Sequence, residues 1–377
     1  MKENVFQRME REGTKEFTKQ FMEMQKWDYR TKLFHAASRA NDFVNECKRR
    51  GLNYHASVGG LDSITMLLWL RRIGIEMPAI SASTLEDKSI QAVHKQIGVV
   101  NIPPLKDKDG KTYTKARVIR DFGFPVISKE IAAKIELLQN PSEKNKTVRH
   151  AIITGETGEY GGNQKNSRMK LAQKWLDLFG GYENETEGVH YGVPDFKVSS
   201  KCCYYLKERP CDIWAKEHNS VPFVGLMASE GGRREKALKM HGCNYFGATS
   251  IRCAPFAIFS RQDVLQLALD LNVPVPSIYG EIVRDPDGTL RTTGAERTGC
   301  SLCGFGIHLE QRPNRFDKLR ERNPKEWEYL MTHLVQDESG EWYGWGKVLD
   351  YIGVGWQDEP GDVLPGQISF FEQRSKE

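Results

Sequence analysis

Residues 57–63 read SVGGLDS, and they separate a strand-like run, LNYHA at 52–56, from an apolar helix-like run, ITMLLWLRRIG at 64–74. Gly59 and Gly60 permit backbone conformations closed to other residues and leave space for a ligand to approach. The N–H groups and positive dipole end of the following helix point into such a turn. The geometry suits phosphate binding, but no more than it suits an ordinary turn, and the spacing is neither that of a P-loop nor that of a dinucleotide-binding fold. A plain strand-to-helix turn is the alternative.

The chain around this turn alternates short apolar runs with helical patterns from residue 51 to about residue 155. The runs that indicate strands are NYHASV, PAISAS, VVNIPPL and RHAIITG, and those that indicate helices are SIQAVHKQIG and SKEIAAKIELLQ. This alternation predicts an α/β fold, a parallel sheet with helices on both faces, in which ligands bind at the carboxyl ends of the strands. Further along, VPFVGLM at 221–227 predicts a strand, EKALKMHG at 235–242 a helix, and SRQDVLQLALDLN a helix capped by Ser260.

Three consecutive ranges are expected from changes in composition. Residues 1–50 hold twelve Lys or Arg and eight Asp or Glu, an excess of +4 that equals the net charge of the chain. They predict a basic helical extension, either a solvated helix or a nucleic-acid contact. Residues 51–310 form the main domain, within which 156–198 is Gly- and Asn-rich and predicts a long loop. Residues 311–377 are a helical, aromatic-rich C-terminal region, in which 312–334 predicts helix, with a flexible tail.

Composition excludes several classes of protein. The 377 residues are 39% hydrophobic and 28% charged, as in an ordinary soluble protein. No window approaches 18 uninterrupted apolar residues, so no membrane span is expected. The N-terminal residues lack an apolar signal segment, which argues against secretion and for a cytoplasmic location. In that location eight cysteines indicate metal or redox chemistry more than disulfides.

The cysteines form one notable pattern. Cys202 and Cys203 are adjacent, and Cys300 and Cys303 form a CxxC pair in RTGCSLCGFG. Four thiolates from two segments can hold a zinc ion or a [4Fe–4S] cluster. Adjacent cysteines converge poorly on one ion but can reach separate irons, so the pattern favours the cluster. Unrelated buried cysteines without metal are the alternative, and Cys47, Cys211, Cys243 and Cys253 are expected to be buried or incidental.

The Gly-Gly turn, the Cys-Cys pair and the CxxC pair, in this order, resemble the adenylyl-sulfate and phosphoadenylyl-sulfate (PAPS) reductase family of the PP-loop ATP pyrophosphatase-like superfamily. The resemblance covers roughly residues 50–310. KCCYYLKERP at 201–210 looks like the family's Cys-Cys segment, and within 254–281 six positions fall in register: Pro255, Phe259, Asp263, Val264, Pro274 and Tyr279.

The resemblance implies a Rossmann-like (HUP-type) fold with a [4Fe–4S] cluster on Cys202, Cys203, Cys300 and Cys303. It also implies that ATP or an adenylyl nucleotide binds with Mg²⁺. The residues implied in nucleotide or phosphate binding are Ser57, Gly59, Gly60, Asp62 and Ser63.

Three departures from the family decide the expected chemistry. Val58 stands where the family has the serine of its loop, and Met227 stands where an arginine is expected, which leaves Arg233 and Arg234 as the nearby cations. No cysteine follows Cys303, whereas the reductases use a C-terminal cysteine as nucleophile. Reductive cleavage needs a thiol, because its intermediate is released by thiol exchange. We therefore expect a PP-loop enzyme that adenylylates a substrate for sulfur transfer, with Asp62, Arg233 and Arg234 as catalytic candidates.

Two other functions are open. One is a sulfonucleotide reductase that uses Cys253 or the thiol of a partner protein. The other is a non-enzymatic nucleotide and cluster sensor that binds nucleic acid through its basic N-terminal segment. A nucleotide substrate, nucleic acid, and a sulfur or electron donor protein are the expected partners.

The C-terminal tail carries one further motif, in GQISFFEQRSKE. Gln367, Ile368, Ser369, Phe370 and Phe371 resemble the short peptide by which bacterial DNA-processing proteins dock on the replication sliding clamp. The alternative is that the two phenylalanines pack on the protein's own surface.

Overall fold

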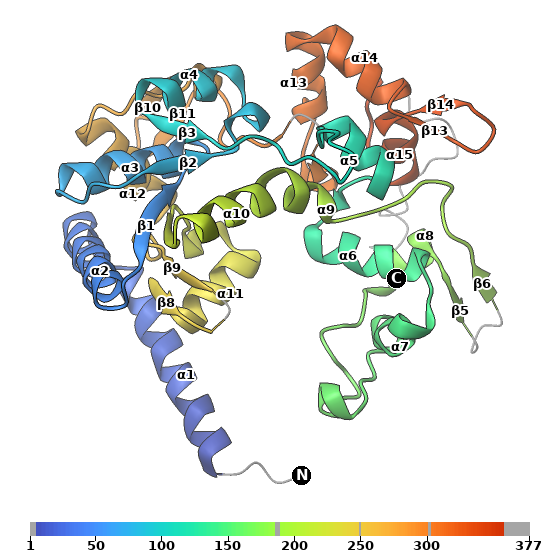
Figure 1. Cartoon of the computed structure of the whole chain (residues 1–377), viewed down its shortest axis with the longest axis horizontal. Helices are drawn as coiled ribbons and strands as arrows, with labels where there is room; N and C mark the ends of the chain where they lie inside the picture. The colour runs from blue at the N-terminus through green and yellow to red at the C-terminus, as the bar shows by residue number, and fades with distance from the viewer. Residues whose placement is uncertain (1–4, 185–188, 249, 301–302, 358–377) are drawn as a thin grey trace. The chain divides into compact units, whose positions relative to one another are not determined.

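The computed structural model describes residues 5–184, 189–248, 250–300 and 303–357 (Figure 1). The chain is an α/β protein with two compact units, each built from separate stretches of sequence. Unit 1 comprises residues 1–104 and 207–300, and unit 2 comprises residues 105–206 and 301–377. These units do not follow the expected consecutive ranges, since 1–50 belongs to unit 1 and 51–310 contributes to both units. No helix within the described residues is long and apolar enough to span a membrane.

Unit 1 is organised by a six-stranded sheet. Its strands are β1 (Asn53–Ser57), β2 (Ala79–Ser81), β3 (Val99–Asn101), β7 (Ser220–Val224), β8 (Asn244–Phe246) and β9 (Ile251–Cys253). The spatial order is β3-β2-β1-β7-β9-β8, and all neighbouring pairs are parallel except β8 with β9. An antiparallel hairpin of β10 (Ile282–Arg284) and β11 (Leu290–Thr292) lies outside this sheet. The predicted parallel sheet is therefore confirmed in its coarse form.

The order of the strands places a topological switch point between β1 and β7. From β1 the chain builds outward to β2 and β3 on one side, whereas β7 and β9 extend the sheet on the other side. The connections that leave β1 and β7 consequently run in opposite directions at their shared carboxyl edge. In open α/β sheets, the crevice at such a switch point is where ligands bind.

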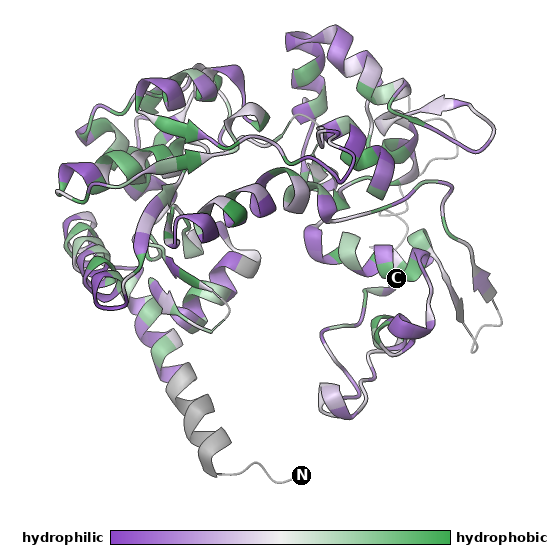
Figure 2. Ribbon diagram, viewed as in Figure 1, coloured by the Kyte–Doolittle hydropathy of each residue, from purple (hydrophilic) through white to green (hydrophobic). Residues whose placement is uncertain are grey.

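Helices cover the sheet of unit 1. They are α1 (Val5–Met24), α2 (Tyr29–Arg49), α3 (Leu61–Arg72), α4 (Lys88–Gln96), α10 (Arg209–Glu217), α11 (Gly232–His241) and α12 (Arg261–Asp270). In Figure 2 the helices α2, α4, α10 and α12 combine hydrophilic and hydrophobic residues around the largely hydrophobic strands β2 and β3. The helix α3 is the exception to amphipathic patterning, because most of its residues are buried.

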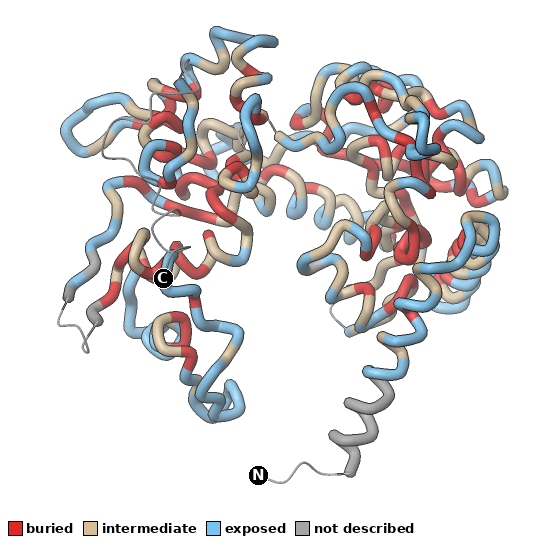
Figure 3. The backbone as a smooth tube through the Cα atoms, turned by 180° about the vertical axis from the view of Figure 1, so that it is seen from behind, coloured by how far each residue is buried: buried red, intermediate tan, exposed pale blue. Residues whose placement is uncertain are grey.

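The expected solvated N-terminal extension is wrong for α2, which is part of the core. Ala36, Ala40 and Phe43 are fully buried, and the Phe43 ring lies 5.0 Å from the Phe223 ring of β7. Buried and exposed positions alternate along this helix (Figure 3). Such a stripe at helical spacing packs a helix onto a sheet, and it was hidden in the sequence by the many charges between the apolar positions.

Unit 2 consists mostly of helices around a second core. Its helices are α5 (Lys115–Phe122), α6 (Lys129–Gln139), α7 (Lys146–Thr154), α8 (Gln173–Phe179), α9 (Lys201–Cys203), α13 (Arg315–Arg322), α14 (Pro324–Thr332) and α15 (Trp345–Tyr351). Its short strand pairs are β4 (Val126–Ile127) with β12 (Gly304–Phe305), β5 (Tyr182–Asn184) with β6 (Val189–Tyr191), and β13 (Val335–Gln336) with β14 (Trp342–Tyr343). Trp345 is fully buried, and its ring lies 5.1 Å from that of Phe124.

Several local predictions are confirmed, and three are wrong. RHAIITG is the second half of α7 rather than a strand, and the helix ends at Gly155, whose φ of 85° suits glycine. The expected loop at 156–198 contains α8, β5 and β6. The expected helix at 312–334 is two helices, because Pro324 cannot continue a helix and Asn323 takes an extended φ of −149°.

Candidate functional site

The SVGGLDS turn lies at the switch point, where β1 ends at Ser57 and α3 begins at Leu61. The Gly59 N–H donates to Ser63 Oγ (2.7 Å), and the Ser63 hydroxyl donates to the Gly60 carbonyl (2.9 Å). Val58, the residue that departs from the family's pattern, is buried in the core of unit 1. The turn is thus held by its own hydrogen bonds, with Ser63 as the residue that closes it.

A buried histidine from α4 also supports the turn. His94 Nε2 lies 2.8 Å from the Gly59 carbonyl oxygen, and its Nδ1 lies 2.9 Å from Ser83 Oγ. A carbonyl oxygen only accepts, so Nε2 carries the proton and Nδ1 accepts from the Ser83 hydroxyl. Burial lowers the pKa of His94, which favours this neutral form. Sequence reasoning did not select His94, because a histidine on an apolar helix face carries no signal of its partners.

Tyr279 covers the start of α3. A Cβ atom on Gly60 would lie 2.2 Å from Tyr279 Oη and 3.2 Å from Thr298 Oγ1, so only glycine fits beneath these hydroxyls. The Leu61 N–H donates to Tyr279 Oη (3.1 Å), and the Tyr279 and Thr298 hydroxyls are 2.8 Å apart. Burial raises the pKa of Tyr279, which keeps the phenol neutral. The phenol oxygen therefore stands where a ligand oxygen would meet the first N–H of α3.

Asp62 is the carboxylate of the turn, and it forms an ion pair with Arg261 of α12. The two side chains are 27% and 30% exposed, so the pair is mostly shielded from water. Burial raises the pKa of Asp62, and the Arg261 charge opposes that shift. Arg261 Nη2 also donates to the Glu296 carbonyl (3.1 Å). Sequence reasoning missed Arg261, although it directly follows the predicted cap Ser260.

Ser57 faces a buried histidine of its own strand. Its Oγ lies 3.4 Å from His55 Nε2, and His55 Nδ1 lies 2.8 Å from Ser220 Oγ of β7. His55 is buried, and burial lowers its pKa to about 4. A Ser57 hydroxyl engaged in this way is directed to the sheet, whereas the residues that surround the turn are Gly59, Gly60, Asp62 and Ser63.

Of the two arginine candidates, Arg234 lies in the first turn of α11, where it pairs with Glu230. The Arg234 side chain is half exposed. Arg233 lies in the same helix, and its side chain is outside the described residues. The charges of Arg234 and Glu230 also act on Asp62. A further charge pair, which was not anticipated, lies beside the turn. Lys207, four residues after Cys203, pairs with Glu86, whose Oε1 would be 3.9 Å from a Cβ on Gly59.

All eight cysteines are thiols rather than disulfides. The four predicted ligands, Cys202, Cys203, Cys300 and Cys303, are partly exposed, whereas Cys47, Cys243 and Cys253 are buried. Cys202 and Cys203 lie in α9, which leads into a π-helical turn at Tyr204–Glu208, a feature frequent at functional sites.

The two cysteines of the CxxC pair stand in different surroundings. Arg315 Nη1 donates to the Cys303 carbonyl (3.0 Å) in unit 2, and Cys300 is the last residue of unit 1. Within the part of the chain that the structure describes, no three or more His, Cys, Asp or Glu side chains gather as metal ligands. Among the described residues the four thiols are therefore not gathered as a set of metal ligands, and what they share is their partial exposure.

Cys253, the nucleophile considered for a reductase, is fully buried in β9. Burial raises its pKa well above the usual value for a thiol. A nucleophilic cysteine must be accessible and ionised, and Cys253 is neither. The structure therefore opposes Cys253 as a catalytic nucleophile.

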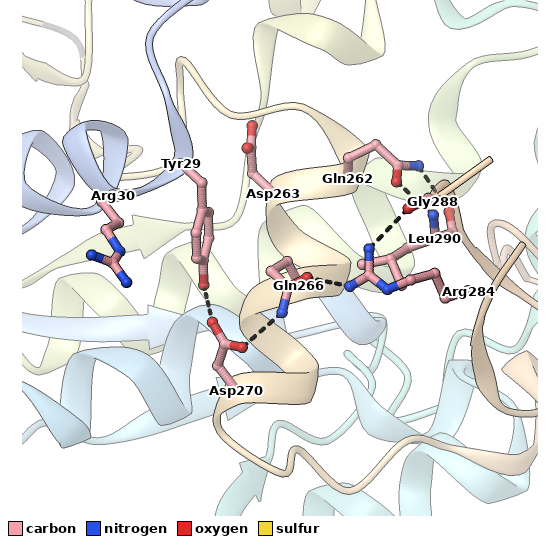
Figure 4. Close-up of a pocket in the computed structure, with 9 residues that line it drawn as sticks. All are labelled: Tyr29, Arg30, Gln262, Asp263, Gln266, Asp270, Arg284, Gly288 and Leu290. Carbon is pink, nitrogen blue, oxygen red and sulfur yellow. Dashed lines mark hydrogen bonds between the residues drawn. The ribbon is translucent and has the colours of Figure 1, made fainter. Parts of the chain in front are cut away.

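Two pockets lie elsewhere in unit 1. The first, of about 500 Å³, lies between the start of α2 and α12 (Figure 4), where Tyr29 Oη lies 2.6 Å from Asp270 Oδ2 and Arg284 Nη2 lies 2.6 Å from Gln266 Oε1. The second, of about 690 Å³, lies at the amino ends of β1 and β7 beside Trp214 and His218. Neither pocket is lined by residues 57–63, so the candidate nucleotide site rests on the geometry of the turn.

Comparison with protein-family models, curated proteins and solved structures gives no match for this chain. The candidate clamp-binding residues Gln367, Ile368, Ser369, Phe370 and Phe371 lie outside the described residues.

Proposed function

We propose that the chain is a PP-loop enzyme with a Rossmann-like (HUP-type) nucleotide-binding unit. It uses ATP or an adenylyl nucleotide with Mg²⁺ to adenylylate a substrate for sulfur transfer, with a nucleic acid or a small molecule as the acceptor. The observation that carries this proposal is the position of the glycine turn. SVGGLDS joins the central strand β1 to α3 at the topological switch point of the sheet, beside β7.

The residues of the turn have distinct roles in this proposal. Phosphate oxygens meet the N–H groups at the start of α3, where the phenol oxygen of Tyr279 now accepts from Leu61. The nucleotide therefore displaces Tyr279 or shares the site with it. Gly60 leaves the space for this contact, and His94 and Ser63 hold the turn in shape.

Asp62 and Arg261 supply the charges. Adenylylation joins the acceptor to the α-phosphorus of ATP and breaks the bond to pyrophosphate, so negative charge accumulates on the leaving group. A cation at that position lowers the barrier. The Arg261 guanidinium is suited to this role because it is mostly shielded from water and held by Asp62. Asp62 would also be the carboxylate ligand for Mg²⁺. The metal ion and Arg261 would then compete for the Asp62 carboxylate.

A [4Fe–4S] cluster suits the thiols present, because Cys202, Cys203, Cys300 and Cys303 are accessible and thiolates are the ligands of such clusters. A bound cluster supplies iron that can hold sulfide for transfer. Arg315, which is bonded to the Cys303 carbonyl, places a cation beside that thiolate. A sulfur donor protein is the expected partner.

The test is anaerobic purification followed by reaction with ATP, adenylyl sulfate and PAPS in turn, with the products identified. We expect pyrophosphate from ATP when the acceptor is present. Release of sulfite from a sulfonucleotide would instead identify a reductase, which would need a thiol from a partner because Cys253 is buried. Nucleotide binding without either product would identify the sensor.

A further inference from the structure

The loop between α7 and α8 in unit 2 is a defined structure that projects beyond α7 (Figure 1). Hydrogen bonds join its two ends, from the Ser167 N–H to the Gly155 carbonyl and from the Leu171 N–H to the Ile152 carbonyl, both 2.8 Å. The Thr157 N–H donates to the Gln164 carbonyl (2.9 Å) across the middle. We call residues 155–171 the basic loop, because of the charges that it carries.

In the described part of the chain, the cations of the basic loop are exposed and unpaired. Residues 155–171 hold three Lys or Arg and two Glu, and the wider stretch 141–176, which includes the flanking helices, holds seven Lys or Arg and three Glu. Lys165, Arg168 and Lys170 are exposed, and among the described residues no carboxylate pairs with them. The loop's own carboxylates are Glu156, which lies 3.6 Å from His150, and the exposed Glu159.

An aromatic side chain accompanies these cations. Tyr160, on the short 3₁₀ turn Glu159–Gly161, is fully exposed to water. The three glycines around it (Gly158, Gly161 and Gly162) add no side chains beside the ring. Bases of single-stranded nucleic acids stack on such rings, while neighbouring Lys and Arg contact the phosphates.

The N-terminal segment, where the sequence analysis expected such a contact, is different. Five of its cations pair with carboxylates within unit 1: Lys26 with Glu23, Lys32 with Asp263, Arg39 with Asp42, and Arg49 and Arg50 with Glu46. Paired charges attract phosphate weakly, since a bound phosphate must first replace the carboxylate. Most of the cations at 26–50 are thus paired with a carboxylate, whereas Lys165, Arg168 and Lys170 of the basic loop have no such partner among the described residues.

We propose that the basic loop binds single-stranded nucleic acid, with Lys165, Arg168 and Lys170 on the phosphates and Tyr160 stacked on a base. This surface belongs to unit 2, so the proposal is independent of the chemistry at the SVGGLDS turn. The proposed function allows a nucleic acid as the acceptor but does not say where it binds. The basic loop would be that binding surface.

The test is fluorescence anisotropy of the full-length protein with labelled single-stranded oligonucleotides at several salt concentrations, without ATP. We expect the triple variant Lys165→Ala, Arg168→Ala, Lys170→Ala to bind at least tenfold more weakly, with the slope of log K against log salt smaller by about 2. Tyr160→Ala is expected to weaken binding about tenfold and to leave the slope unchanged. The matched control, Lys108→Ala, Lys318→Ala, Lys325→Ala, removes the same charge from exposed positions of unit 2.

The proposal is overturned if the control triple weakens binding as much as the loop triple, because net charge alone would then explain the effect. It is also overturned if the parent protein binds anionic vesicles or duplex DNA in preference to single strands. Circular dichroism and ATP affinity should be unchanged in all these variants. Loss of oligonucleotide binding with retained ATP binding separates this surface from the nucleotide site.

Discussion

Gly59 and Gly60 are adjacent residues with different surroundings. A Cβ on Gly60 would lie 2.2 Å from Tyr279 Oη, whereas the nearest atoms to a Cβ on Gly59 are 3.9 Å away. We expect Gly60→Ala to force Tyr279 from its position, to lower the free energy of unfolding by about 1–3 kcal/mol, and to weaken ATP binding. Gly59→Ala, the matched control, should change stability by about 0.5 kcal/mol or less. Urea unfolding and ATP titration measure both effects, and parent-like ATP affinity in both variants would place the nucleotide elsewhere.

Asp62 and Arg261 lie far apart in the sequence but are coupled. Arg261→Ala leaves a largely buried carboxylate, so we expect the free energy of unfolding to fall by about 1–3 kcal/mol and the pKa of Asp62 to rise further. The double variant Asp62→Asn, Arg261→Ala should lose less free energy of unfolding than the two single variants lose in sum. The difference, which is the coupling energy of the pair, should be about 1 kcal/mol or more. Additive single effects in urea unfolding would mean that the pair is not formed. Asp62→Ala should also slow Mg²⁺-dependent turnover more than it weakens ATP binding.

At the scale of elements, a buried ion pair adds to the apolar contacts that hold α2 on the core of unit 1. Lys32 Nζ lies 2.8 Å from Asp263 Oδ2 of α12, and the two side chains are 6% and 11% exposed. Lys32→Ala leaves the Asp263 charge without its cation, so we expect a loss of about 3 kcal/mol in the free energy of unfolding. Lys48→Ala, on the exposed end of the same helix, should have no measurable effect. A similar small effect of both changes would show that the Lys32–Asp263 pair contributes little to the attachment of α2.

The strand β1 makes the stability of unit 1 depend on pH. Burial holds the pKa of His55 at about 4, whereas an unfolded histidine has a pKa of about 6.5. Above pH 6.5 His55 is neutral in both the folded and the unfolded protein. As the pH falls from 6.5 to 4, the unfolded state gains a proton that the folded state excludes, so the free energy of unfolding decreases by about 3 kcal/mol. Burial also lowers the pKa of His94, which acts in the same direction.

Urea unfolding at several pH values measures this dependence. His55→Asn should reduce the loss of stability between pH 6.5 and 4, because the titrating group is absent. His333→Asn changes an exposed histidine and should leave the dependence as it is. An unaltered pH dependence in His55→Asn would show that His55 is accessible to protons in the folded protein.

At the scale of the whole molecule, four of the eight cysteines, Cys202, Cys203, Cys300 and Cys303, are predicted to bind a [4Fe–4S] cluster. Anaerobically prepared protein should contain about four irons per chain, with absorbance near 400 nm from thiolate–iron charge transfer. Cys203→Ser and Cys300→Ser should each remove the iron. Cys211→Ser is the matched control, since Cys211 is also partly exposed but its pKa is raised by burial to about 11. Stoichiometric zinc in place of iron would contradict the prediction.

The sequence by itself determined the features that depend on near neighbours. The turn at 57–63 and the cap at Ser260 are present, and the helical runs predicted at 89–98 and 128–139 are α4 and α6. The capping bond from Asp263 N–H to Ser260 Oγ joins residues only three apart. Residues 149–155, the second half of α7 and its capping glycine, were predicted as a strand because the β-branched residues and short length fit either structure. The capping glycine was the local sign of a helix end.

Only the tertiary structure decided which side chains meet. Tyr279 reaches Leu61 across 218 residues, and Arg261 reaches Asp62 across 199. The order of the strands sets these contacts, and residue spacing carries no record of it. The same holds for charge: the cations of residues 26–50 are mostly paired with carboxylates, whereas Lys165, Arg168 and Lys170 face solvent. Composition counts charges, but packing decides which of them pair with a carboxylate and which face solvent alone.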